Sequence, residues 1–265
     1  MKSQKICRFT LKNSSQPSFG LVEDDNIFVL DTSQSDVIPP LNATITQQRL
    51  KLDSVRLLPP SIPTKIVCIG RNYKKHAEEL GNKMPPEPLI FLKPTSSVIA
   101  TGESIILPTA SKQVEHEGEI GVVIGRTCSK ISPSENPLKY VYGYTCLNDV
   151  TARDLQRKDV QFTRGKSFDT FCPVGPFAVT NLDPTNLTVT TRVNGITKQM
   201  ENSSNMAFPI SEIIRFISQV MTLFPGDIIA TGTPAGVSKL NPNDIVEVVV
   251  DGIGVLSNPV ADSLT

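Results

Sequence analysis

Three glutamates alternate with other residues in the segment QVEHEGEIGVV, which spans residues 113–123. Glu115, Glu117 and Glu119 share one parity, and an apolar run follows them. Because side chains alternate faces along a strand, Glu117 and Glu119 would project from one side, about 6–7 Å apart. Two carboxylates held this close repel each other unless a proton or a cation lies between them. The segment alone fits either a solvated acidic edge or a site for Mg²⁺ or Mn²⁺, which prefer oxygen ligands.

Asp149 is a third acid that would suit such a site. It ends the apolar run YVYGYTCLND and is followed by Arg153 and Gln156, which share a face if the segment is helical. An aspartate at this position can cap the helix that follows it. It can equally complete a site with the two glutamates, but sequence spacing alone does not bring the three carboxylates together.

His76, Glu79 and Lys166 are candidates for acid–base and charge-stabilising roles. His76 and Glu79 lie three residues apart in NYKKHAEEL, so they share a face on a helix. A carboxylate that holds a histidine in one tautomer makes a general base, although this segment is also typical of a polar surface helix. Lys166 lies in QFTRGKSFDTFCPVGP among aromatic residues and prolines. There it could stabilise an oxyanion or extend over a loop surface.

Several other kinds of site are excluded by the sequence. RGKS at 164–167 lacks the glycine of a phosphate-binding loop because position 160 is valine. HEGEI has Ile120 where a zinc-protease helix requires a second histidine. The chain has two histidines and no G-x-S-x-G elbow, so a Ser-His-Asp triad is not expected. These absences leave the acidic cluster as the main candidate.

Composition favours a small-molecule partner in a cytoplasmic protein. The formal net charge is zero and there is no basic run, which argues against nucleic acid or an anionic membrane as a partner. The N-terminus lacks the apolar region of a secretory signal, and no stretch has the apolar length of a membrane span. The five scattered cysteines include no C-x-x-C pair and indicate buried, reduced thiols.

We expect two domains, with residues 1–60 as a small β-rich N-terminal domain and residues 61–265 as the catalytic domain. PSFGLVEDDNIFVLD predicts a hairpin, and the prolines at 59, 60 and 63 make a stiff connector. The first domain is too small to hold much core alone, so it should pack on the second. Strand patterns dominate the rest, with one long amphipathic helix at PISEIIRFISQV. The pattern predicts an α+β, mainly β fold.

Several motifs in a fixed order resemble the fumarylacetoacetate hydrolase family, in particular its acylpyruvases and oxaloacetate decarboxylases. They include CIGRNYKKHAEELG, EHEGEIGVVIG, GYTCLNDVTARDLQ, RGKSFDTFCPVGP and DIIATGTPAGV. The resemblance covers roughly residues 64–260, and motifs in fixed order are far more specific than any one alone. It implies a mixed β-roll and β-sandwich core behind a small variable N-terminal domain, and usually a homodimer.

The resemblance also implies site residues. The ligands of Mg²⁺ or Mn²⁺ would be Glu117, Glu119 and Asp149. The catalytic residues would be His76, Glu79 and Lys166. Residues that contact the substrate's carboxylate or keto groups would be Arg71, Gln156 and Thr233. It implies no ligand role for the flanking Glu115 and His116.

The activity that the resemblance implies is hydrolysis of the C–C bond of acylpyruvate-type 2-keto acids through a metal-stabilised enolate. The same enolate serves decarboxylation of oxaloacetate, keto–enol tautomerisation, or isomerisation of 2-hydroxyhepta-2,4-diene-1,7-dioate. A catalytically silent metal-binding protein is the non-enzyme alternative. A shared fold does not choose among these reactions. We also expect HAEELGNKMPPEP to act as a lid that orders over bound substrate.

Overall fold

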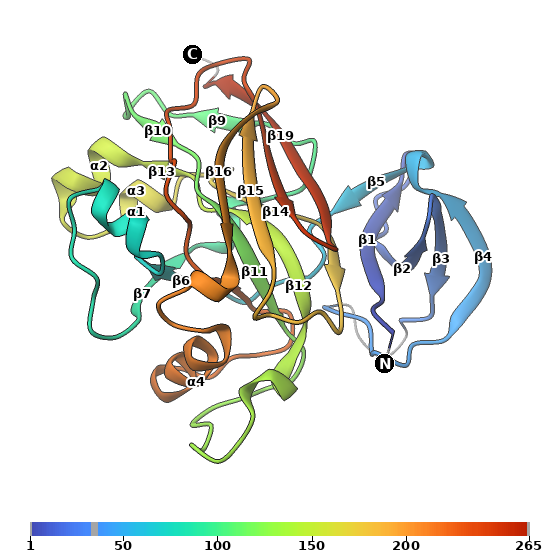
Figure 1. Ribbon diagram of the computed structural model, residues 1–265. Helices are drawn as coiled ribbons and strands as arrows, with labels where there is room; N and C mark the ends of the chain where they lie inside the picture. Colours follow the sequence, from blue (N-terminus) through green and yellow to red (C-terminus); the bar gives the residue numbers. More distant parts are fainter. Residues whose placement is uncertain (1, 33–36, 264–265) are drawn as a thin grey trace.

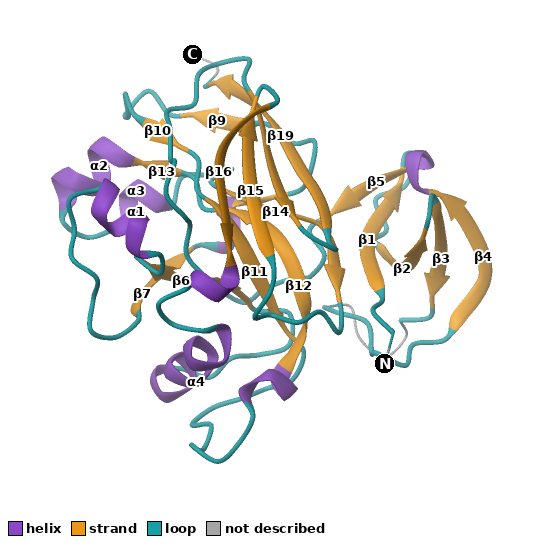
Figure 2. Cartoon of the chain, viewed as in Figure 1, coloured by secondary structure: helices purple, strands orange, loops and turns teal. Residues whose placement is uncertain are grey.

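The computed structural model describes residues 2–32 and 37–263, and within them the chain is an α+β protein made mainly of strands (Figure 2). The strands are β1 (Lys5–Leu11), β2 (Ser18–Glu23), β3 (Asn26–Leu30), β4 (Ile45–Lys51), β5 (Val55–Leu58), β6 (Ile66–Gly70), β7 (Leu89–Lys93), β8 (Val98–Ile99), β9 (Ile105–Leu107), β10 (Val114–Glu115), β11 (Gly118–Ile124), β12 (Val141–Asn148), β13 (Thr151–Ala152), β14 (Cys172–Val179), β15 (Thr188–Val193), β16 (Ile196–Asn202), β17 (Ile228–Ala230), β18 (Ile245–Val250) and β19 (Gly254–Asp262). The α-helices are α1 (Lys74–Glu79), α2 (Arg153–Asp159), α3 (Thr163–Lys166) and α4 (Ile210–Val220).

The N-terminal strands form a lobe at one side of the molecule, coloured blue in Figure 1. β1, β2, β3 and β4 pair as consecutive antiparallel neighbours, which confirms the predicted hairpin of β2 and β3. β5 returns to pair with β1, and β1 also pairs with β14 of the main body, with Lys5 opposite Val179. The lobe therefore shares a sheet with the remainder, as its small size predicts.

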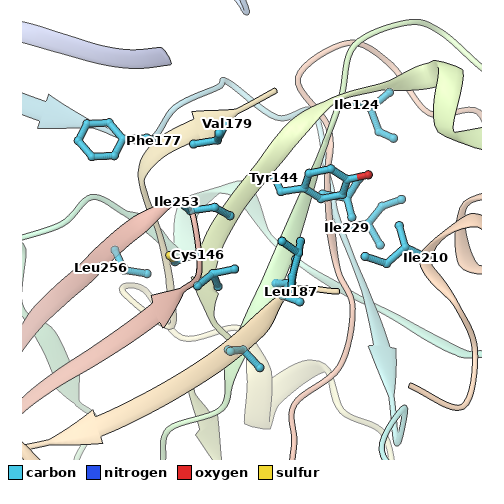
Figure 3. Packing of buried hydrophobic residues seen from close by; sticks show 14 of the residues in the cluster. Ile124, Tyr144, Cys146, Phe177, Val179, Leu187, Ile210, Ile229, Ile253 and Leu256 are labelled. Carbon is cyan, nitrogen blue, oxygen red and sulfur yellow. The ribbon is translucent and has the colours of Figure 1, made fainter. Parts of the chain in front are cut away.

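Two mixed sheets and a two-stranded sheet of β10 and β13 make up the main body, and the larger mixed sheet continues into the lobe. The larger one follows the order β4-β3-β2-β1-β14-β12-β11-β17-β6-β7, and the smaller one follows β16-β15-β18-β19-β9. Parallel pairs such as β6 with β17 occur among antiparallel ones. Buried residues from both sheets and α4 form one apolar cluster, in which Tyr144, Leu187, Ile210 and Ile253 lie near one another (Figure 3).

Sheet register determines where the acidic segments meet. β11 and β12 are antiparallel with Gly118 opposite Asn148, so Glu117 and Asp149 lie at the same end of the pair. β17 lies on the other side of β11, with Ala230 opposite Gly121, and leads into the segment that contains Thr233. Gly118 is required at its position because a Cβ there would lie 1.9 Å from Thr191 Oγ1. Three segments distant in sequence thus converge on one end of β11.

The short helices α1, α2 and α3 gather at the end of the body opposite the N-terminal lobe (Figure 1). α4 buries Ile210, Ile213, Ile214 and Ile217, the apolar face that its spacing predicts. Among residues 2–32 and 37–263 no helix is long and apolar enough to cross a membrane.

Candidate active site

Three buried carboxylates meet at the start of β11. Oxygens of Glu117, Glu119 and Asp149 all lie within 4.8 Å of one another. The Asp149 N–H donates to the Glu117 carbonyl at 2.8 Å, and the Glu117 N–H donates to Asn148 Oδ1 at 2.9 Å. These backbone contacts fix the spacing between the E-x-E segment and the aspartate. Asp149 is not a helix cap, since α2 begins at Arg153 with Ala152 as its N-cap.

Two of these carboxylates bind lysine ammonium groups. Lys166 Nζ lies 2.7 Å from Glu117 Oε2 and 2.6 Å from Asp149 Oδ2. Lys93 Nζ lies 2.6 Å from Asp149 Oδ1. Burial alone would raise the pKa of Glu117, but Lys166 and Arg153 lower the pKa of that carboxyl well below its usual range. Burial opposes the charge of Lys166, yet Asp149 and Glu117 raise the pKa of its ammonium, so it is a fixed cation.

Glu119 lies in a different electrostatic environment. Its Oε2 accepts the Gly232 N–H at 2.7 Å, and among the described residues no ion pair joins it to a cation. Burial and the nearby Asp149 and Glu117 raise the pKa of Glu119 well above its usual range. A divalent cation among the three carboxylates would relieve this repulsion. All-oxygen donors of this kind fit Mg²⁺ or Mn²⁺.

Arg153 joins the acidic cluster to α2. Its Nε donates to Glu115 Oε2 at 2.8 Å, its Nη2 binds Glu117, and its Nη1 donates to Gln156 Oε1 at 2.7 Å. The Arg153 side chain is 3% exposed, so these charge-assisted bonds form away from water and hold the Glu117 carboxylate in one orientation. Arg153 also orients Gln156, which lies on the wall of the cavity.

His76 lies on α1 over the cavity. Its Nδ1 is 3.4 Å from Glu79 Oε2, and the Glu79 carboxylate accepts the Gly236 N–H at 3.0 Å. Burial lowers the pKa of His76, although the Glu117 charge opposes this shift. Asn72 fixes the start of this segment by donating to the carbonyls of Thr231 and Phe208. The lowered pKa favours the neutral imidazole, and the contact of Nδ1 with Glu79 leaves Nε2 as the nitrogen that can exchange a proton.

Thr233 and His116 belong to one hydrogen-bonded network centred on Gln199. Thr233 Oγ1 donates to the Gly118 carbonyl at 2.9 Å and accepts from Gln199 Nε2 at 2.8 Å. Gln199 Oε1 accepts the Gly118 N–H and contacts His116 Nδ1, both at 3.0 Å. The other ring nitrogen of His116 contacts Ser238 Oγ at 2.9 Å. Both nitrogens of His116 are therefore engaged outside the carboxylate cluster.

A cavity of about 320 Å³ joins these groups. All nine residues proposed from the sequence line it except Glu79, which is held against His76 and Gly236. A larger hollow of about 990 Å³ adjoins it and shares Arg71, Phe91, Val160 and Phe162. Arg71 has a φ of 60°, in the left-handed region that non-glycine residues seldom adopt. The cavity is large enough for a small organic acid.

Sequence reasoning missed Lys93, Arg153, Glu115 and Gln199 as parts of this cluster. All four are buried. Lys93 contacts Asp149, Arg153 contacts Glu115 and Glu117, and Gln199 contacts Thr233. A signal was available for Lys93, because it is a lysine that ends the apolar run LIFLK. For the other three, only the three-dimensional pairing shows the role.

The fold and the carboxylate cluster define the class of the protein. The model of the fumarylacetoacetate (FAA) hydrolase C-terminal domain matches residues 65–261, and the Rv2993c-like N-terminal model matches residues 4–60. The chain belongs to the fumarylacetoacetate hydrolase family. The resemblance inferred from the sequence motifs is confirmed.

Relatives of this chain are named for different activities. The chain is 44% identical to oxaloacetate tautomerase YisK of Bacillus subtilis over 216 residues, which cover 76% of this chain and 71% of that relative. A 2-hydroxyhepta-2,4-diene-1,7-dioate isomerase structure from Mycobacterium marinum matches with a TM-score of 0.88 and 37% identity, covering 99% of this chain and 100% of that one. A fumarylpyruvate hydrolase from Pseudomonas aeruginosa, in complex with Mn²⁺ and pyruvate, matches with a TM-score of 0.72 and 26% identity, covering 82% and 93%.

Proposed function

We propose that the protein is a divalent-metal-dependent enzyme that forms the enolate of a small 2-oxo acid, and that keto–enol proton transfer is its reaction. The observation that carries this proposal is the buried cluster of Glu117, Glu119 and Asp149 with Lys166 bound to two of its members. Mg²⁺ or Mn²⁺ held by the three carboxylates would supply a Lewis acid for the carboxylate and 2-oxo oxygens of the substrate. The name of the tautomerase relative supports the choice of reaction.

His76 transfers the proton and Lys166 stabilises the oxyanion in this proposal. Nε2 of His76 takes a proton from C3 of the substrate, and the electron pair of that C–H bond forms the C2=C3 bond of the enolate. The Lys166 ammonium donates a hydrogen bond to the developing oxyanion at C2 and stays protonated. The His76 imidazolium then passes the proton taken from C3 to that oxygen through a water molecule, which gives the enol and returns His76 to its neutral form. A neutral His76 beside a charged Lys166 is the protonation pattern that this transfer requires.

Hydrolysis of acylpyruvates is the second candidate, and the contact between His76 and Glu79 favours it. A histidine oriented by a carboxylate can deprotonate a water molecule for attack on the distal carbonyl. The name of the fumarylpyruvate hydrolase neighbour supports this alternative. Decarboxylation of oxaloacetate is the third outcome to test. The C3–C4 bond breaks with release of CO₂, its electron pair forms the enolate of pyruvate, and this enolate takes a proton at C3, so the reaction needs no base.

The test is an assay of freshly dissolved oxaloacetate and of acetylpyruvate with Mg²⁺ or Mn²⁺, following enol absorbance, pyruvate and CO₂ separately. Metal without protein gives the background rate. We expect loss of the enol signal without CO₂, and a fall of about a hundredfold or more in Lys166→Met and His76→Asn. The exposed Lys158→Met is the control. No turnover of these or related diketo acids would favour the silent metal-binding alternative.

The assembly and location inferred from the resemblance and composition also stand as proposals. A homodimer would be seen as twice the mass of 28.9 kDa in light scattering after size-exclusion chromatography. A cytoplasmic location would be tested by fractionation of cells.

A further inference from the structure

The proposed base lies on a helix that is too short to be stable without tertiary contacts. α1 has six residues, Lys74–Glu79, and its N-cap residue Tyr73 makes no side-chain hydrogen bond to the helix. Helices of this length are not stable in isolation. The position of His76 therefore depends on the contacts that the two ends of α1 make with the rest of the protein.

Both ends of α1 are bound to the loop that follows β17, residues 231–236. Before the helix, Asn72 Nδ2 donates to the Thr231 carbonyl at 2.8 Å. At the last residue of the helix, the Glu79 carboxylate accepts the Gly236 N–H at 3.0 Å. The helix and this loop are thus joined at two points, one on each side of the base.

The same loop is bound to the strand that carries a proposed metal ligand. The Gly232 N–H donates to Glu119 Oε2 at 2.7 Å. Thr231 Oγ1 donates to the carbonyl of Ile120, the next residue of β11, at 2.8 Å. The amide of Asn72 is therefore one residue away, through the loop, from the Glu119 carboxylate.

Asn72 is fully buried, and every hydrogen-bonding atom of its amide has a partner. Besides the bond to Thr231, Nδ2 donates to the Phe208 carbonyl at 3.1 Å, and Oδ1 accepts the Phe208 N–H at 2.8 Å. Only one orientation of the amide satisfies all three bonds. The segments are also closely packed, because a Cβ on Gly232 would lie 2.6 Å from the Cβ of Asn72.

We propose that Asn72 is a positioning residue for proton transfer: its amide fixes α1 against residues 231–236 and so sets the position of His76 relative to the carboxylate cluster. The inference rests on the proposed function, in which His76 removes a proton from C3 of the substrate. Asn72 is not part of the cavity lining, so it acts through other residues. A misplacement of about 1 Å can lower a rate about a hundredfold.

Two substitutions of Asn72 test this inference in the Mn²⁺-loaded protein. Asn72→Asp keeps the shape and one acceptor oxygen but removes both donated hydrogen bonds, and Asn72→Ser is an uncharged second variant if the buried carboxylate prevents folding. We measure kcat per oxalate-binding site, which counts only folded, metal-loaded molecules. We expect kcat to fall about a hundredfold. KM and the affinities for Mn²⁺ and oxalate should stay within about threefold of the wild type, because the lost interaction acts on the transition state.

Asn258 is a matched control. It is also buried, and its Nδ2 donates to two backbone carbonyls, those of Ala100 and Glu103, both at 2.8 Å. It does not line the cavity. Asn258→Asp and Asn258→Ser should lower the melting temperature as the Asn72 variants do. They should leave kcat per oxalate-binding site within about twofold of the wild type, because the two sites are independent.

Each outcome decides the inference. If kcat per oxalate-binding site falls no further in the Asn72 variants than in the Asn258 variants, the inference is wrong and the proposed function stands. A loss of Mn²⁺ or oxalate affinity as large as the loss in kcat would also overturn it, because Asn72 would then act on the metal cluster instead of the base. Absence of turnover by the wild-type protein would overturn the proposed function and this inference with it.

Discussion

Lys93 Nζ lies 2.6 Å from Oδ1 of Asp149, and Lys166 Nζ lies 2.6 Å from the other oxygen of the same carboxylate. The Lys93 side chain is fully buried and also donates to the Val150 carbonyl at 3.1 Å. Removing an ammonium and a carboxylate from water is costly, so they persist inside a protein only when well paired. β7 thus fixes the orientation of a proposed metal ligand from within the core.

Lys93→Met should destabilise the metal-free protein and strengthen metal binding. Loss of one partner of a buried ion pair costs roughly 3 kcal/mol. The same substitution makes the carboxylate cluster more negative, so Mn²⁺ should stabilise the variant more than it stabilises the wild type. Urea unfolding with and without Mn²⁺ measures both effects.

Lys65→Met is the matched control for this prediction. Lys65 Nζ pairs with the buried Asp227 at 2.6 Å and is not part of the lining of the 320 Å³ cavity. Its loss should lower stability without changing the increment that Mn²⁺ adds. An Mn²⁺ increment in Lys93→Met that is no larger than in the wild type would contradict the account.

Glu117→Gln and Glu115→Gln should separate a metal ligand from its supporting neighbour. Both carboxylates bind Arg153, but only Glu117 lies in the cluster of three. We expect Glu117→Gln to weaken Mn²⁺ binding by about a hundredfold or more, and Glu115→Gln by about tenfold or less. Calorimetric titration with Mn²⁺ measures both, and a smaller loss in Glu117→Gln than in Glu115→Gln would show that the ligands are assigned wrongly.

The family and the mainly β fold could be predicted from the sequence, but much of the site's support could not. Two features of the site are local patterns: the alternation of Glu117 and Glu119, and the helical spacing of His76 and Glu79. Local patterns can be recognised in a single sequence. The position of Asp149 depends on the register of β11 and β12. Register is a long-range property that no spacing along the chain encodes.

Several strands were not predicted from the sequence, and for β4 and β16 the physical reason is clear. β4 is exposed at nearly every position and carries no apolar alternation. In β16 the buried residue is polar, since Gln199 faces inward while Met200 is 65% exposed. A strand that buries an amide to hold Thr233 and His116 is not predicted as a strand, because strands are usually recognised by apolar residues on one face.

Gln199→Leu should cost stability because it removes partners from several buried groups at once. The side chain bonds to the Gly118 N–H, Thr233 Oγ1 and the Pro234 carbonyl. A buried polar group left unpaired costs about 1–3 kcal/mol, so we expect a loss of roughly 3 kcal/mol in urea unfolding. Gln219→Leu removes the bonds of an exposed glutamine to the Ile131 carbonyl at 3.0 Å and to Ser218 Oγ at 3.4 Å, and it should cost less than about 1 kcal/mol. Equal losses in the two variants would contradict this account.

The acidic limb of the pH–rate profile should follow the protonation of His76, and Glu79→Gln should move that limb to lower pH. Burial lowers the pKa of His76, while the hydrogen bond and charge of Glu79 raise it. The neutral imidazole is the proposed base, so kcat at saturating Mn²⁺ and substrate should fall only below the ordinary histidine pKa of about 6.5. Removing the Glu79 charge lowers the pKa of His76 further. The acidic limb should therefore move to lower pH, while the plateau rate falls because the base is weaker.

Glutamine at position 79 keeps an oxygen for the Gly236 N–H, so the contact between α1 and that loop can persist in the variant. Glu78→Gln is the matched control, because Glu78 is exposed, pairs with Lys74 at 3.8 Å and does not contact His76. Its pH profile should match that of the wild type. An acidic limb that stays in place in Glu79→Gln, or moves to higher pH, would show that the titrating base of the reaction is a group other than His76 held by Glu79.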